Sequence, residues 1–132
     1  MTGLILLATT LLAPARAAEL VMFEQKGCVW CQKFDREIAP AYDKTNEGQR
    51  APLRRVDIAQ PMPPDLAFIN RERFTPVFVL VENGREFGRI RGYPGDLFFW
   101  GLLANMIERL DRGESVPSQA STSAPPVVTF AE

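Results

Sequence analysis

The two cysteines of the chain, Cys28 and Cys31, are separated by two residues in the segment GCVWCQKF. Four kinds of site use this spacing: a structural disulfide, half of a zinc site, a clip for a soft metal ion and a redox centre. Each kind of site requires different surroundings. The neighbouring residues therefore decide which chemistry the pair can perform.

A metal site needs more ligands than this pair supplies. Structural zinc takes four ligands, and the sequence has no histidine and no further cysteine. One chain therefore cannot close a zinc site. Two thiolates can hold copper(I), with Met22 and Met62 as additional ligands, so a copper-binding module stays an alternative.

A purely structural disulfide is the simplest alternative for an exported protein. A bridge over two intervening residues closes a very small loop, however, and removes little entropy from the unfolded chain. Stability alone gives little reason for this spacing. The redox centre is the interpretation that the surrounding sequence favours.

The cysteine pair lies where a predicted strand passes into a predicted helix. Residues 20–24 form a short apolar run, and apolar or aromatic residues recur at helical spacing after Val29. Unpaired N–H groups and the positive end of the helix dipole favour a thiolate at Cys28, and Lys26 adds positive charge. Cys31, one turn later, can then attack a mixed disulfide formed on Cys28.

The remaining pattern predicts three more strands and further helices. Pro40 predicts a break in the first helix near Glu37, and residues 46–52 read as a loop. Asn83 and Gly84 indicate a hairpin. Strands are expected at 53–58, 77–82 and 85–91, and helices at 64–71 and 96–110. This order predicts an α/β fold with a four-stranded mixed sheet and helices on both faces.

Both ends of the chain are expected to lie outside the folded domain. Residues 4–13 form a short apolar run before Ala15, Arg16 and Ala17, which predicts a signal peptide at 1–17 and export to the periplasm. Residues 113–132 are rich in Ser, Pro and Ala, which predicts a flexible tail. The domain is therefore expected at 18–112.

Composition limits the classes of partner. The chain has 132 residues, 23% of them charged, and a net charge of −1, so it has no basic field for nucleic acid. The arginines Arg85, Arg89 and Arg91 alternate on one predicted strand, which is typical of a solvated face, with an anion-facing surface as the alternative. The run LFFW at 97–100 has more apolar residues than one helix face can bury, so a surface patch is an alternative to core packing there.

From residue 20 to residue 111 the chain resembles the thioredoxin superfamily. The resemblance is carried by C-V-W-C after an apolar strand, Pro40 in the next helix, Thr75 and Pro76 before the strand at 77–82, the Asn-Gly hairpin, and Gly92 after the last strand. The chain is most similar to small periplasmic members encoded with bacterial sulfur-oxidation enzymes.

The resemblance implies roles for particular residues. Cys28 and Cys31 are the catalytic pair, and Pro76 is cis and packs against them. The backbone of Thr75 is then free to pair with an extended substrate segment. The implied substrate-binding residues are Val29, Trp30, Thr75, Pro76 and Gly92.

Two positions depart from ordinary thioredoxin. Met22 stands where thioredoxin has a buried aspartate beneath its resolving cysteine, so proton transfer to Cys31 must use another group, such as Glu24 or water. Val29 and Trp30 replace the family's Gly-Pro, so the reduction potential of thioredoxin does not carry over.

The implied function is that of a periplasmic thiol–disulfide oxidoreductase that needs no cofactor or metal. It would reduce protein disulfides or cysteine–sulfur adducts on a partner such as a sulfur-carrier protein, with electrons from a membrane thiol transporter. The sequence shows no dimerisation domain, so a monomer is expected. The alternatives are a disulfide isomerase or oxidant, a copper(I)-binding module and a non-redox adaptor.

Overall fold

The computed structural model describes residues 17–117, in which the chain forms one four-stranded sheet. The strands are β1 (Glu19–Glu24), β2 (Leu53–Asp57), β3 (Val77–Glu82) and β4 (Arg85–Arg91), in the order β2-β1-β3-β4. β1 is parallel to β2 and antiparallel to β3, and β3 is antiparallel to β4. The sheet is mixed, as predicted. The predicted signal segment up to residue 16 and the tail beyond residue 117 lie outside the described residues.

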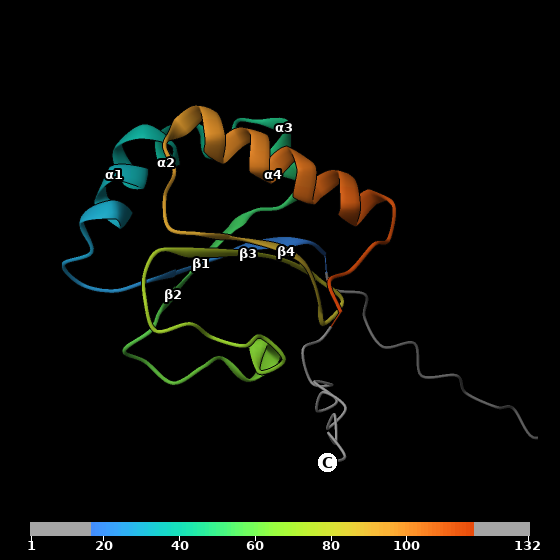
Figure 1. Cartoon of the computed structure of the whole chain (residues 1–132), viewed down its shortest axis with the longest axis horizontal. Helices are drawn as coiled ribbons and strands as arrows, with labels where there is room; N and C mark the ends of the chain where they lie inside the picture. Colours follow the sequence, from blue (N-terminus) through green and yellow to red (C-terminus); the bar gives the residue numbers. More distant parts are fainter. Residues whose placement is uncertain (1–16, 118–132) are drawn as a thin grey trace, which may run out of the picture.

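The helices cover the two faces of the sheet unequally (Figure 1). They are α1 (Val29–Glu37), α2 (Ala39–Tyr42), α3 (Asn46–Arg50), α4 (Asp96–Asp111) and the 3-10 helix η1 (Pro64–Leu66). The four α-helices lie together on one face, and η1 with its loops lies on the other. Within residues 17–117, no helix is both long enough and apolar enough to cross a membrane.

The larger core lies between the α-helices and the sheet. Phe34 of α1, Phe78 of β3 and Phe99 of α4 are fully buried, with ring centroids 4.8 to 5.3 Å apart. Tilted and edge-to-face contacts of this kind add to the stabilisation that burial itself provides. The aromatic cluster therefore fixes α1, which carries the cysteines, against both the sheet and α4.

A second core covers the opposite face. Val21 and Phe23 of β1 point into it, because side chains alternate along a strand, and they meet Leu66 and Ile69. Hydrogen bonds join Leu66 N–H to Pro63 O and Ile69 N–H to Leu66 O, both over three residues. The helix predicted at 64–71 is wrong in length: only Pro64–Leu66 is helical, in the 3-10 form. A tight turn of three residues places Leu66 and Ile69 on the same side, toward the sheet.

The first helix ends where proline predicts it should. α1 stops at Glu37, and Ile38 is shared as the cap between α1 and α2. Pro40 lies in the first turn of α2, where a missing N–H costs nothing because no intrahelical acceptor is available there.

The loop predicted at 46–52 is wrong, since Asn46–Arg50 form the short helix α3. Thr45 starts it: its hydroxyl donates to Tyr42 O at 2.7 Å and accepts from Gly48 N–H at 3.0 Å. Gly48 is required here, because a Cβ at this position would lie 1.8 Å from Tyr42 O. The helix results from one cap and one close approach, which periodicity does not reveal.

Replacing Thr45 with alanine is expected to lower the free energy of unfolding by about 1 kcal/mol, because the N-cap hydrogen bond to Gly48 is lost. Urea unfolding followed by far-ultraviolet circular dichroism measures the change. Thr45→Ser keeps the hydroxyl and is expected to retain most of the wild-type stability. Equal losses in the two variants would show that the hydroxyl is not the stabilising group.

Candidate redox site

Cys28 and Cys31 form a disulfide at the N-terminus of α1, with an S–S distance of 2.10 Å and a Cα–Cα distance of 5.2 Å. The loop after β1 turns at Gly27, whose φ of +79° is readily adopted only by glycine, and Cys28 then caps the helix. The backbone N–H of Cys31 donates to Cys28 Sγ at 3.1 Å. Cys28 therefore occupies the position at which helix N–H groups stabilise negative charge.

The two sulfurs differ in their access to solvent. Cys31 is 4% exposed and belongs to the larger core, whereas Cys28 is half-buried and lies at its margin. A partner sulfur that approaches from solvent therefore reaches Cys28 first. Thiol–disulfide exchange requires direct contact between the attacking and attacked sulfurs.

The charges around Cys28 favour its thiolate. The first turn of α1 has no acidic residue, and Lys26 is exposed in the preceding loop. Lys33, one turn further along α1, lies over the Trp30 ring with its Nζ 5.7 Å from the ring centroid. Lys33 is also paired with Glu37 at 3.9 Å, so the helix dipole and Lys26 are the groups that favour the thiolate.

The sheet brings the other predicted site residues to the same end as the cysteines. Phe23, near the end of β1, pairs with Val77, and Val77 pairs with Arg91, so the loops next to these residues are neighbours. Figure 1 shows the start of α1, the start of β3 and the end of β4 at one side of the molecule. The loops that carry the cysteines, Thr75–Pro76 and Gly92 therefore meet there.

Pro76 and Gly92 are joined directly. The peptide bond between Thr75 and Pro76 is cis, the isomer that the resemblance implies. Pro76 is buried and Thr75 is half-buried. The N–H of Gly92, whose φ is +80°, donates to Pro76 O at 2.8 Å.

Exposed apolar side chains flank the disulfide. Val29 and Trp30, the two residues between the cysteines, are 68% and 54% exposed. Phe74, which precedes Thr75, is 47% exposed and was not among the binding residues predicted from the sequence. Its position next to Thr75 and Pro76 is the signal that could have identified it. Apolar side chains that stay exposed beside a reactive sulfur are suited to contacting a protein partner.

Tyr93 and Glu37, which were not predicted as site residues from the sequence, form a contact that holds α1 in place. Tyr93, next to Gly92, packs edge-on against Phe34, and its hydroxyl donates to Glu37 Oε2 at 2.7 Å. Burial, with a smaller contribution from Glu37, raises the pKa of Tyr93, so its hydroxyl stays protonated and donates. The pair ties the end of α1 to the loop that contains Gly92.

The structure shows where Met22 and Glu24 lie, the two residues at which proton transfer to Cys31 was expected to differ from thioredoxin, and where Met62 lies. Met22 is fully buried in the same core as Cys31, and no charged side chain is buried in the described residues. Glu24 lies at the end of β1 and accepts a hydrogen bond from Arg55 at 2.6 Å. Met62 packs against the second core, on the opposite face of the sheet from Met22. The two methionines therefore do not converge on the cysteines.

Comparison with known proteins agrees with this geometry. The profile of the thioredoxin-like domain family matches residues 12–106. The chain is similar to the periplasmic thioredoxin SoxS from Paracoccus pantotrophus, whose crystal structure is of the reduced form. The two sequences are 46% identical, and the match covers 70% of this chain and 98% of the SoxS chain, with a TM-score of 0.66.

A more distant structure shares the fold. Thioredoxin-2, a component of the malaria parasite protein secretion machinery, is 19% identical, covers 68% of this chain and 84% of its own, and has a TM-score of 0.51. No curated protein sequence matches the chain. The family profile, the SoxS structure and the C-x-x-C disulfide together show that the chain belongs to the thioredoxin-like family and is a thiol–disulfide oxidoreductase.

Proposed function

We propose that this protein is a periplasmic reductase of protein disulfides or cysteine–sulfur adducts, with Cys28 as the attacking residue and Cys31 as the resolving residue. The observation that carries the proposal is the unequal burial of the two cysteines, because Cys31 is 4% exposed whereas Cys28 is only half-buried and is the one a partner can reach first. The capping hydrogen bond to Cys28 Sγ supports the same assignment.

The reaction transfers two electrons to the partner in two exchange steps. In the reduced protein, the Cys28 thiolate attacks one sulfur of the partner, forms a mixed disulfide and releases the other sulfur as a thiolate or sulfide. Cys31, as a thiolate, then attacks Cys28 Sγ and releases the partner's cysteine in reduced form. The intramolecular disulfide between Cys28 and Cys31 is the oxidised product of this sequence.

Substrate positioning is assigned to the residues around the disulfide. The exposed side chains of Val29 and Trp30 contact the apolar part of the partner. The backbone of Thr75 pairs with an extended partner segment, and Pro76 and Gly92 shape the adjoining surface through their hydrogen bond. Water takes the role of proton acceptor for Cys31, because Glu24 is paired with Arg55.

The compartment and the partner are proposed from similarity. The 46% identity to a periplasmic thioredoxin supports a periplasmic location, with residues 1–17 as the signal peptide, 18–112 as the domain and 113–132 as a tail. The sequence resemblance implies a sulfur-carrier protein as the substrate and a membrane thiol transporter as the electron donor. We propose that the protein acts as a monomer.

Expressing Cys31→Ser in the native periplasm tests this proposal. Without the resolving sulfur, the mixed disulfide on Cys28 persists, and non-reducing electrophoresis with mass spectrometry identifies the trapped partner. A sulfur-carrier subunit is the expected partner, and the double variant Cys28→Ser/Cys31→Ser is expected to trap nothing. If Cys31→Ser also traps nothing while stoichiometric copper co-purifies with the wild type, the copper-binding alternative holds instead. Trapping of many unrelated secreted proteins would indicate a general oxidant or isomerase.

A further inference from the structure

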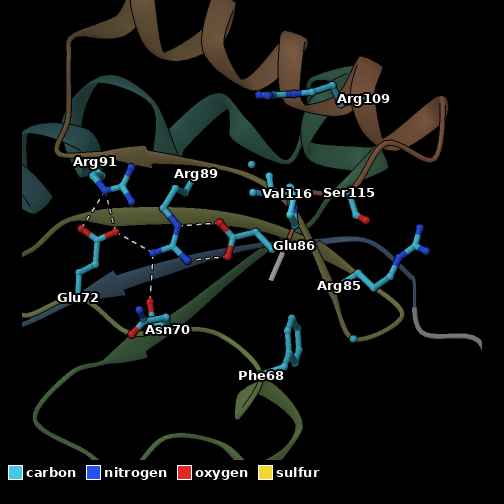
Figure 2. Close-up of a pocket in the computed structure, with 13 residues that line it drawn as sticks. Phe68, Asn70, Glu72, Arg85, Glu86, Arg89, Arg91, Arg109, Ser115 and Val116 are labelled. Atoms are coloured by element: carbon cyan, nitrogen blue, oxygen red, sulfur yellow. Dashed lines mark hydrogen bonds and ion pairs between the residues drawn. The ribbon is translucent and has the colours of Figure 1, made fainter. Parts of the chain in front are cut away.

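A pocket of about 570 Å³ lies along β4, one of the two edge strands of the sheet, and shares no residue with the redox site (Figure 2). Helix α4 borders it on one side, and the segment from Phe68 to Glu72 borders it on the other. Its charged lining residues are four arginines and two glutamates: Arg85, Arg89, Arg91, Arg109, Glu72 and Glu86. The pocket therefore carries an excess of two positive charges, unlike the nearly neutral chain as a whole.

Both carboxylates of the pocket are already bound by the arginines of β4. Arg89 donates to both oxygens of Glu86, at 2.6 and 2.5 Å, and to Glu72 Oε1 at 2.7 Å. Arg91 donates to Glu72 through its Nε at 2.8 Å. These pairs neutralise Arg89, which is half-buried. Neither Arg85 nor Arg109 therefore pairs with a glutamate of the pocket.

Arg109 is the unusual member of the set. Its Nε is buried and has no hydrogen-bond partner among the described residues. A buried donor without a partner destabilises a protein by about 1 to 3 kcal/mol, and native structures seldom keep one without a reason. Arg109 extends from α4 on the side of the sheet that this helix covers, and Figure 2 shows it above β4.

Gly88 leaves room for Arg109 to lie close to β4. A Cβ on Gly88 would lie 2.7 Å from Met106 Cγ and 3.2 Å from Arg109 Nη2. A side chain at residue 88 would therefore push Met106 and the guanidinium away from β4. The glycine on this strand lets α4 and Arg109 approach the sheet closely.

The segment after α4 closes one end of the pocket. The chain turns at Gly113, and Val116 N–H donates to Glu86 O at 2.8 Å on the edge of β4. The carboxylate nearest Arg109 on this segment is Glu114, whose pKa is lowered mainly by its hydrogen bond with Arg112 and less by the charge of Arg109. Glu114 is exposed and bound to Arg112 at 2.9 Å, so it does not satisfy the buried Nε.

We propose that this pocket binds an oxyanion of the sulfate or phosphate class, with Arg109 donating the hydrogen bonds. A guanidinium offers donors in a fixed fork that matches two oxygens of such an anion. Arg85, which stacks on Phe87 and has no glutamate of the pocket as a partner, contributes positive field beside Arg109. The pocket is larger than one oxyanion, so it accepts either the free ion or the same group carried on a small molecule that reaches Phe68.

Titration of the oxidised wild-type protein with sodium sulfate, sodium phosphate and phenyl phosphate, at ionic strength matched with sodium chloride, tests the proposal. Nuclear magnetic resonance is expected to show a saturable shift of the Arg109 Nε–H signal, a readout that needs no variant to fold. Tighter binding of phenyl phosphate than of phosphate would identify a phosphate ester as the ligand, and equal binding would identify the free ion. An Arg109 signal that stays fixed in all three titrations would overturn the proposal.

A pair of variants separates a specific site from general charge attraction. Arg109→Met is expected to weaken binding by about tenfold or more while disulfide reduction continues at the wild-type rate. Lys44→Met removes the same charge from an exposed position outside the pocket and is expected to leave binding within about twofold of the wild type. Equal weakening in the two variants would show only non-specific screening and would refute the site.

Discussion

Cys28→Ser is expected to abolish disulfide reduction, lowering the rate to that of the assay without protein, at least about 100-fold below wild type. The variant loses the more exposed sulfur, and the remaining Cys31 is 4% exposed, on the side of α1 that packs into the larger core. Reduction of insulin by the protein, with dithiothreitol as the electron donor, measures the rate.

Two further variants complete this experiment. Cys31→Ser is expected to form a stable mixed disulfide when its Cys28 thiolate attacks oxidised glutathione and releases one glutathione thiolate, detected as an added mass on the intact protein, because Cys28 stays accessible. Gln32→Ser changes the exposed neighbour of Cys31 and is expected to leave the insulin reduction rate unchanged. An active Cys28→Ser protein that forms the glutathione adduct on Cys31 would reverse the proposed roles of the two sulfurs.

The largest stability effect is expected at Phe99. Phe99→Ala is expected to lower the free energy of unfolding by about 3 to 5 kcal/mol, the range for removing a fully buried phenylalanine. Its ring contacts Phe34, Phe78, Tyr93 and Trp100, so its loss leaves a cavity that those four rings line. Urea unfolding of the oxidised protein measures the change.

The adjacent phenylalanine provides a matched control. Phe98 is 72% exposed, and Phe98→Ala is expected to change the free energy of unfolding by less than about 0.5 kcal/mol. The two substitutions remove the same atoms from neighbouring positions of α4. Similar losses in both would mean that helix propensity, and not packing of the aromatic cluster, controls stability here.

The segments that were predicted correctly are those whose structure is fixed by a few neighbouring residues in the sequence. β3 and β4 have the predicted bounds, because Asn83 and Gly84 adopt φ values of +50° and +71° and so form the tight turn that the dipeptide favours. Pro40 ends α1 through the geometry of its own ring. In each case, a few adjacent residues supply the whole physical reason.

The segments that were predicted wrongly lack an apolar repeat that would reveal their structure, or depend on how they pack against the rest of the fold. α3 forms because Thr45 caps it and Gly48 fits against Tyr42 O, in a stretch without apolar periodicity. Only Pro64–Leu66 is helical at η1, and the residues after it form no further helix, although Leu66 and Ile69 both reach the second core. The arginines that alternate on β4 were read as a solvated face, yet Arg89 is only 13% exposed and is bound to Glu72 and Glu86.

The spacing of the two cysteines and their place at a strand-to-helix junction are enough to favour a redox pair in which one thiol attacks and the other resolves. The exposure of each cysteine, and the burial of Phe99 rather than Phe98 in LFFW, become visible only in the folded molecule. The same is true of Arg109, which lines a basic pocket and has a buried, unpaired Nε. The physical reason is that residue type and spacing fix covalent and local electrostatic properties, whereas exposure and pairing depend on how separate elements pack against each other.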